Sequence, residues 1–533
     1  MTVTETPPEV AAPARPAPAA VAPAARPPGL VAAVGSGDHK VVGRLYIGFS
    51  LLFLLASGVA GQLFSVDRVN GTLGDTILSK DTWFQVATFH SITALFLGAV
   101  PLLLGVAIVV VPLQIGSAAL ALPRAAAASF WGWLLGGGIL VAAYIANGGP
   151  GGGSRRAVAL SITALILVVV SLLLACVCVA TTVLTLRAPG MSLDRTPLFS
   201  WSMLAGSVLW LVSLPTLVGV LILAYVDHRY GRVRFGAGGA LYGEIRWVFL
   251  VPQVLGFALP VLGLLADTGA TAARARLGQR GVGVAAVGLA SFFSFGAWLQ
   301  LSVSPGVTRQ PVLPALALLA LLPILAIGGM TANGIRTGER FRLHSGFLFA
   351  VLAWLQLLLA AVLGVGWTIS RFDLQGTTYE GAVAHLALLA ATTAGVGSLW
   401  YWATKVFGRP LAEGAGRLVA VLLFLGSIAL AAPDAVSGAF GKGDEATKGI
   451  ESLNALSAAG GGLVALAVVV AVLVAAMALS GRGPHAEVPA DPWGGVTLEW
   501  RTGSPPPAGN FATPPRVISA EPMLDPTAEE ATA

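Results

Sequence analysis

The chain has 533 residues, of which 56% are hydrophobic and only 11% are charged. So few polar side chains cannot cover a soluble globule of this size, so the composition predicts a multi-pass membrane protein. The net charge of +6 forms no nucleic-acid-binding patch, and two cysteines, Cys176 and Cys178, are too few for a disulfide framework.

Residues 1–37 are rich in proline and alanine and show no apolar periodicity. Such a segment cannot bury enough apolar surface to fold, so we expect a disordered tail on the cytoplasmic side. A basic stretch followed by a short apolar core is missing here, so no signal peptide is expected.

Twelve apolar runs of roughly 18 residues or more predict twelve transmembrane helices within residues 38–480. Their limits are about 41–65, 85–112, 129–147, 157–186, 199–226, 246–267, 282–303, 312–335, 344–369, 379–406, 416–433 and 453–480. An even number of spans places both termini on one side. Lysine and arginine are more numerous in the loops on that side, which predicts cytoplasmic termini. Residues 481–533 then form an extended cytoplasmic tail, in which Pro505–Pro507 favours an extended backbone.

Several separate segments carry a resemblance to one family. They are Asp38–Tyr46, Phe89–Trp131, Arg187–Trp201 and Asp491–Trp500. These segments resemble subunit 1 of cytochrome c oxidase, the core subunit of the haem-copper oxidases, and the resemblance extends from about residue 38 to about residue 517. It implies an all-α twelve-helix bundle in a bacterial plasma membrane and a place in respiratory electron transport to oxygen.

The residues that reduce oxygen in the resembled family are missing. On its sixth helix the family has His-Pro-Glu-Val-Tyr, whereas this chain has Val251-Pro252-Gln253-Val254-Leu255. The family's seventh helix carries two adjacent histidines, and Ser291–Ser304 contains none. Imidazole is the nitrogen ligand that suits copper, and the chain offers no cysteine or methionine cluster instead. We expect no copper and no catalytic residue.

The family's proton paths are also missing. An aspartate and asparagines mark the first path, and Ala119, Ile108 and Ala126 stand at the matching positions here. The second path uses a lysine on the eighth helix, and Leu313–Ala332 contains no lysine. We therefore expect no proton pumping.

Two histidines, His90 and His385, fall inside predicted membrane helices. A polar ring in a bilayer is costly unless it is paired or binds a metal. In the resembled family, these two helices supply both axial ligands of the low-spin haem. One interpretation is that His90 and His385 bind the iron of a single low-spin haem, and the other is that each ring hydrogen-bonds a neighbouring helix. The remaining histidines, His39, His228, His344 and His485, are expected to be solvated.

The role of His385 stays open at this point. The family's tenth helix reads Ala-His-x-His, and this chain reads Ala384-His385-Leu386-Ala387. Matched on Ala-His, His385 takes the place of the high-spin haem ligand and Ala387 has lost the low-spin one. Counted from Thr378-Tyr379, His385 falls between the two positions.

Two further positions bear on a haem. Arginines of the family's Met-Pro-Arg-Arg pair with haem propionates, but this chain reads Ala432-Pro433-Asp434-Ala435, and an aspartate would repel a propionate. Arg68 resembles an arginine at the periphery of the low-spin haem. Since arginines at helix ends commonly extend to the membrane interface, we expect Arg68 to do so.

The preferred interpretation is a degenerate oxidase subunit with at most one low-spin haem, acting as an electron conduit or accessory subunit. Its partners would be the lipid bilayer and other respiratory oxidase subunits or a cytochrome donor. The alternative is a haem-free structural or assembly partner of a respiratory complex. A transporter ranks third, because no buried charged residue suggests a coupling site. Whether the chain is an enzyme stays open.

Overall fold

The computed structural model describes residues 35–70, 77–150, 152–231, 253–296, 311–443, 448–480 and 489–526. These residues form α-helices, short 3-10 segments and one π-helical segment, with no strand among them. Residues 1–34 lie outside the described ranges, so the disordered N-terminal tail stays a prediction. The compact unit that carries the site comprises Gly37–Ala533.

Ten helices in the described ranges are long and apolar enough to cross a membrane. Their bounds are α2 His39–Asp67, the continuous run α3 Lys80–Ile92, η2 Thr93–Ala99 and α4 Val100–Gln114, then α5 Pro123–Ile145, α6 Arg155–Thr185, α7 Leu198–Tyr230, α13 Val312–Thr337, α14 Ser345–Thr368, α15 Thr378–Tyr401, α17 Glu413–Ala439 and α18 Glu451–Leu479. The predicted all-α membrane bundle is confirmed.

The two other predicted spans are described in part. The span expected at 246–267 contains α9 (Gln253–Gly256) and α10 (Leu259–Ala273), and the span expected at 282–303 contains α11 (Arg280–Gly296). Both adjoin stretches outside the described residues. Short elements complete the fold: η1 Arg68–Asn70, η3 Leu193–Arg195, η5 Ser370–Phe372, α16 Ala403–Val406, η6 Leu498–Arg501 and η7 Pro522–Leu524.

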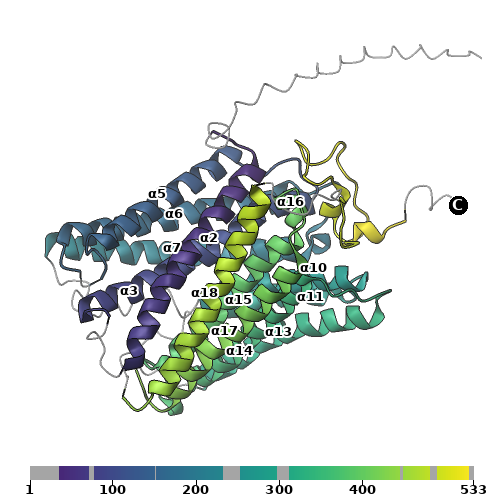
Figure 1. Ribbon diagram of the computed structural model, residues 1–533. Coiled ribbons are helices and arrows are strands. Elements are labelled where there is room, and N and C mark those ends of the chain that lie inside the picture. Colours follow the sequence, from purple (N-terminus) through teal and green to yellow (C-terminus); the bar gives the residue numbers. More distant parts are fainter. Residues whose placement is uncertain are drawn as a thin grey trace, which may run out of the picture. The chain divides into compact units, whose positions relative to one another are not determined.

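The run Asp81–Gln114 is the central helix of the bundle. Its apolar window is completely buried by protein, and α4 contacts α2, α6, α7 and α15. Consecutive helices pack side by side, α5 against α6 and α17 against α18, and α18 returns to contact α2 (Figure 1). Small residues let these helices approach: a Cβ on Gly105 of α4 would lie 3.0 Å from the carbonyl oxygen of Gly43 on α2.

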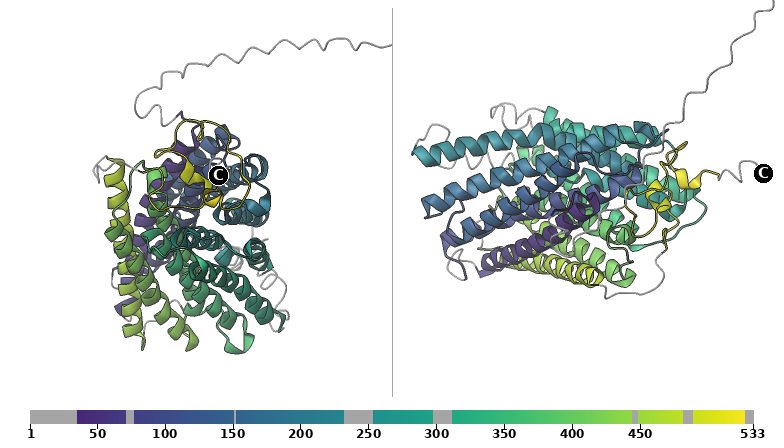
Figure 2. Two further views of the ribbon diagram at one scale, coloured as in Figure 1. Left: turned by 90° about the vertical axis from the view of Figure 1, so that its right-hand side faces the viewer. Right: turned by 90° about the horizontal axis from the view of Figure 1, so that it is seen from above.

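The C-terminal segment, residues 489–526, packs on the end of the bundle where α4 and α15 end, which we call the tail end (Figure 2). Trp493, Val496, Leu498 and Trp500 of this segment are buried. Arginines of the α13–α14 connection bind its backbone: Arg340 donates to the carbonyl of Trp493 at 2.7 Å. The segment therefore covers the helix ends in a largely irregular conformation.

Candidate functional site

His90 on α3 and His385 on α15 face each other inside the bundle. Their ring centroids lie 6.1 Å apart with the planes inclined by 47°. Both side chains are half-buried. An imidazole nitrogen sits about 2 Å from a first-row metal ion that it binds, so two rings on opposite sides of one ion have their centres about 6 Å apart. The observed separation fits two axial ligands of a single iron.

The second ring nitrogen of His90 is fixed by α2. His90 Nδ1 lies 2.8 Å from the carbonyl oxygen of Ser57. Because a carbonyl can only accept, Nδ1 carries the proton and donates it, which leaves the lone pair on Nε2. A backbone carbonyl on the non-ligating nitrogen is the usual support of a metal-binding histidine. His90 is therefore held in the tautomer that binds a metal through Nε2.

Gly61, one turn after Ser57 on α2, makes room for this ring. A Cβ at Gly61 would lie 2.6 Å from His90 Cε1 and 2.7 Å from Nδ1. Residues four apart share one face of a helix, so Ser57 and Gly61 together form the wall against which the ring rests. The absence of a side chain at Gly61 is thus required by the position of the imidazole.

A π-helical segment, Thr93–Ala99, follows His90 within one turn and is completely buried. π-helical turns inside α-helices are rare and occur frequently at functional sites. Trp133 Nε1 on α5 donates to the carbonyl of Phe96 at 2.9 Å, which satisfies one acceptor of this irregular turn. The helix that presents His90 therefore changes its winding beside the histidine and is tied to α5 there.

The orientation of α15 decides which way His385 points. Ala387 is fully buried in a cluster with Ala360, Ala382, Leu386 and Ala431, which come from α14, α15 and α17. Two residues along a helix differ by about 200° in direction, so His385 points away from the side of α15 on which Ala387 is packed. His385 faces His90 instead, and the position of the family's second histidine is filled by tight alanine packing.

Arg68, at the C-terminal end of α2, is buried at 5% exposure. Its Nη2 donates to Asp434 Oδ1 and to Asn454 Oδ1, both at 3.2 Å. The prediction that Arg68 extends to the membrane interface is wrong, because α17 and α18 supply a carboxylate and an amide for the guanidinium inside the bundle. Asp434 in turn is neutralised by Arg68, so its expected repulsion of a propionate is weakened.

Arg68 also lies on the side of α2 that supports His90. It follows Gly61 by seven residues, which is two helical turns or about 10 Å along the axis. Its Nε is buried and has no hydrogen-bond partner among the described residues. An anionic group at the edge of a ligand held by the two histidines would satisfy this donor.

Two histidines expected to be solvated are buried instead: His39 is 3% and His344 is 2% exposed. His344 stacks between Tyr401, at 5.5 Å between centroids, and Trp493, at 4.9 Å. Burial, helped by the nearby Arg342 cation, lowers the pKa of His344 to about 3, so its ring is neutral. The solvated interpretation failed because the C-terminal segment covers these helix ends.

The structure also contains buried carboxylates that the sequence analysis did not find. Asp267 on α10 is 2% exposed and Glu499 on η6 is 0% exposed. The transporter ranks third because no buried charged residue is evident in the sequence, and these two acids show that buried acidic side chains are present. The signal that could have found them is Gln114, a polar side chain at the end of an otherwise apolar helix, whose amide donates to both acids.

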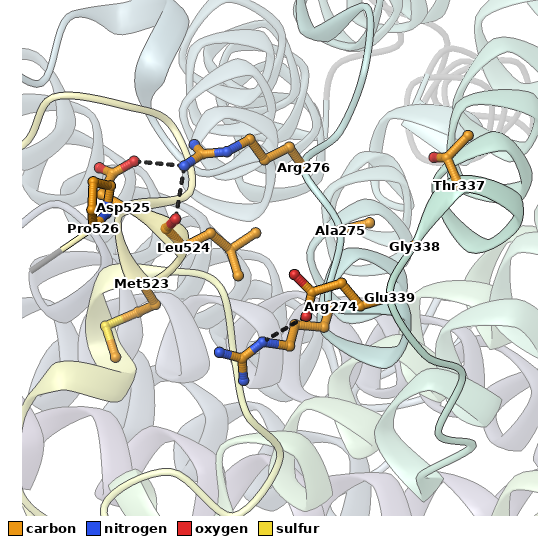
Figure 3. A pocket seen from close by; sticks show the side chains of 10 residues that line it. All are labelled: Arg274, Ala275, Arg276, Thr337, Gly338, Glu339, Met523, Leu524, Asp525 and Pro526. Carbon is orange, nitrogen blue, oxygen red and sulfur yellow. Dashed lines mark hydrogen bonds and ion pairs between the residues drawn. The ribbon is translucent and has the colours of Figure 1, made fainter. Parts of the chain in front are cut away.

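A cleft of about 690 Å³ opens at the tail end, between the α10–α11 turn, the α13–α14 connection and residues 523–526. Its charged residues form pairs: Arg276 binds Asp525 at 2.8 Å and Arg274 binds Glu339 at 3.2 Å (Figure 3). The histidines do not line this cleft, so it is separate from the candidate site.

Several positions that bear on copper binding lie outside the described residues, namely Val251, Pro252 and residues 297–304. Within the described ranges no three histidine, cysteine, aspartate or glutamate side chains are placed to share a metal ion. That finding does not extend to the omitted residues, so the expectation of no copper stays a prediction.

The fold and the facing histidines define a multi-pass helical membrane protein with a candidate metal-binding centre inside its bundle. The model of the family described as cytochrome c and quinol oxidase polypeptide I matches residues 41–480. The chain therefore belongs to this family, the subunit 1 proteins of the haem-copper oxidases, as its sequence resemblance indicated.

Relatives from bacteria and an archaeon agree with this assignment. Cytochrome c oxidase subunit 1 of Bacillus subtilis (strain 168) is 29% identical over 513 residues, which are 91% of this chain and 81% of that protein. A putative cytochrome c oxidase subunit 1-beta of Streptomyces coelicolor is 30% identical over 529 residues, 93% of this chain and 90% of that protein. A heme-copper oxidase subunit I+III of Aeropyrum pernix is 29% identical over 507 residues, 89% of this chain and 60% of that protein.

Family membership and the apolar helices together make the chain a multi-pass protein of the plasma membrane. The family is one of haem proteins that act in respiration, which agrees with a pair of histidines placed inside the bundle.

Proposed function

We propose that this chain is a degenerate haem-copper oxidase subunit 1 that binds one low-spin haem through His90 and His385 and serves as an electron conduit or accessory subunit. The observation that carries the proposal is the 6.1 Å separation of the two rings, with His90 Nδ1 bound to the Ser57 carbonyl. A haem whose iron has two imidazole ligands supplies one-electron transfer when bound.

Several residues of this chain would together hold such a group, each in a different way. Ser57 fixes the His90 tautomer, Gly61 leaves space for the ring, and α15 aims His385 at the same point. Arg68, whose buried Nε has no hydrogen-bond partner among the described residues, would supply a cation for a propionate. Asp434 pairs with the same guanidinium and offsets part of its positive charge. Together these residues would hold and orient a tetrapyrrole whose iron the two imidazoles ligate.

The proposal excludes oxygen reduction and proton pumping by this chain. This exclusion rests on the sequence, in which Val251-Pro252-Gln253-Val254-Leu255 stands in place of the family's histidine, glutamate and tyrosine. None of these side chains ligates copper or exchanges a proton. With cytoplasmic termini, the chain would meet other respiratory oxidase subunits or a cytochrome donor within the bilayer.

A second candidate function is a haem-free structural or assembly partner of a membrane respiratory complex. One observation favours it: Arg68 already has an internal carboxylate, Asp434, and an internal amide, Asn454, as partners. In this alternative the His90 ring is a polar contact between α3 and α2, and no ligand is needed.

The reduced-minus-oxidised absorption spectrum of the purified protein separates the two candidates. The proposal expects a sharp low-spin band that is lost in both His90→Ala and His385→Ala. His228→Ala is the matched control, because His228 lies at the end of α7, where its Nε2 is bonded to the Arg155 carbonyl. A colourless protein from haem-replete cells would support the structural alternative and end the haem proposal.

A further inference from the structure

Glu499 of the C-terminal segment is completely buried against the ends of α4 and α15. Its Oε1 accepts hydrogen bonds from Gln114 Nε2 at 3.2 Å, Trp402 Nε1 at 3.0 Å and Thr497 Oγ1 at 2.9 Å. Its Oε2 is buried and has no hydrogen-bond partner among the described residues. One half of this carboxyl group is therefore fully bonded, and the other half faces protein without a donor.

Gln114 joins Glu499 to a second buried acid. Its Nε2 also donates to Asp267 Oδ2 at 3.1 Å, and its Oε1 accepts from Ser200 Oγ at 2.6 Å, which fixes the orientation of the amide. One NH₂ group thus bridges two buried carboxyl groups. Two such groups in a low-dielectric site do not both ionise readily, because like charges there repel strongly.

The surroundings decide which acid holds the proton. Asp267 accepts the backbone N–H groups of Leu198 and Phe199, each at 3.0 Å, at the start of α7. Backbone donors and the positive end of a helix stabilise a negative charge. The Glu499 side chain accepts hydrogen bonds from other side chains through Oε1 alone and leaves Oε2 without a donor among the described residues, and burial raises its pKa. The arrangement favours ionised Asp267 and protonated Glu499.

The other titratable groups around Glu499 come from α15, α16 and the same segment. Lys405 on α16 donates to three carbonyls of the segment, Ala490 at 2.8 Å, Thr502 at 2.5 Å and Gly503 at 3.3 Å. Tyr401 on α15 binds Thr271 through its hydroxyl group at 2.7 Å. Asp491 is occupied by the backbone N–H groups of Trp493 and Gly495. Among the described residues, the cation near Glu499 is Lys405, and its three donors are already used by carbonyls.

We propose that Glu499 docks the C-terminal segment as a neutral carboxylic acid, so that residues 489–526 form a pH-sensitive latch on the tail end of the bundle. In the undocked segment Glu499 is an ordinary solvated carboxyl group. Docking is strongest at pH values below the ordinary carboxyl pKa and weakens as pH rises, by up to tenfold per pH unit, until the docked acid ionises as well. The latch concerns the segment alone and stands apart from the haem proposal.

Hydrogen exchange of the full-length protein in lipid nanodiscs tests this latch. Peptides covering residues 493–502 are followed in the wild type and in Glu499→Gln at pH 5, 6, 7 and 8. Comparing the two proteins at each pH cancels the intrinsic pH dependence of exchange. We expect the ratio of wild-type to variant opening to rise at least tenfold between pH 5 and pH 8. Equal ratios at every pH, or a ratio that falls as pH rises, would overturn the proposal.

Two further variants keep the test decisive. Asp525→Asn removes another acid of the segment, one that binds Arg276 at 2.8 Å (Figure 3), and should loosen residues 522–526 by the same factor at every pH. If Asp525→Asn abolished the pH dependence at residues 493–502, the assignment to Glu499 would be wrong. Asp267→Asn removes the repelling charge and should preserve docking to higher pH, which gives a second readout if Glu499→Gln folds poorly.

Discussion

Arg68 Nη2 lies 3.2 Å from Asp434 Oδ1, and both side chains are buried, at 6% and 5% exposure. This ion pair joins the end of α2 to α17 at the position where Ala432-Pro433-Asp434-Ala435 differs from the resembled family. The substitution that argued against a haem in the sequence is therefore compensated within the chain, because the aspartate has a cation of its own.

Asp434→Asn should destabilise the bundle strongly. Removing one partner of a buried pair leaves an unpaired buried charge and costs about 3–5 kcal/mol. The measurement is the free energy of unfolding in mixed micelles. Glu339→Gln is the control, because Glu339 is 70% exposed and its pair with Arg274 contributes less than about 1 kcal/mol. Equal effects of the two substitutions would show that Arg68 is solvated.

Gly61→Ala tests the wall behind His90. The added methyl group would lie 2.6 Å from His90 Cε1, so the ring must move, and we expect the low-spin band to be lost or shifted while the protein still folds. Gly48→Ala on the same helix is the matched control, because nothing lies within 4 Å of its added Cβ. An unchanged spectrum in Gly61→Ala would show that His90 does not bind the haem.

Ala387→His restores the second histidine of the family's Ala-His-x-His. Because Ala387 is 0% exposed and packs among Ala360 and Ala431, the larger ring should lower the free energy of unfolding by about 1–3 kcal/mol. Combined with His385→Ala, it should not restore the low-spin band. Recovery of the band in the double variant would mean that α15 presents its other face to His90.

Lys405 should give the docking of the C-terminal segment a second pH dependence of opposite sign. Burial lowers the pKa of Lys405 to about 8, below that of a solvated lysine, so docking disfavours the charged form. Docking should therefore strengthen as pH rises above about 8, since the undocked lysine remains protonated there.

Lys405→Met should abolish that strengthening and should weaken docking at neutral pH by about 1–3 kcal/mol, because three carbonyls lose their donor. Hydrogen exchange of residues 489–504 between pH 7 and pH 10 measures both effects. Lys448→Met, which changes a lysine at the other end of the bundle, is the control. Because Glu499 weakens docking as pH rises, the comparison is made in the Glu499→Gln background, where weaker docking above pH 8 would contradict this account.

Much of the fold follows from the sequence, because each apolar run of membrane-spanning length must become a helix in a bilayer. The histidine pair was also predictable, since His90 and His385 are polar rings in such runs. The direction in which His385 points could not be predicted. Matching on Ala384-His385 and counting from Thr378 assign this histidine to different positions of the family's tenth helix. The structure decides between them, because the His385 ring lies opposite His90 while Ala387 is buried against α14 and α17.

The buried charges could not be predicted for a different reason. Arg68 and Asp434 are separated by 366 positions, and each alone is typical of a helix end. Glu499 lies outside the predicted spans and His344 is at the first residue of one, where sequence patterns indicate exposure. They are buried because the C-terminal segment folds back over the helix ends. The path of such an irregular segment cannot be predicted from apolar periodicity in the sequence.

The central claim is that one haem is held between His90 and His385. The most direct test is the haem content per polypeptide of the purified wild type, His90→Ala and His385→Ala, with the metal content measured on the same samples. The account predicts one haem per chain in the wild type, none in either variant and no copper. A wild type without haem, a haem that survives both substitutions, or stoichiometric copper would contradict it.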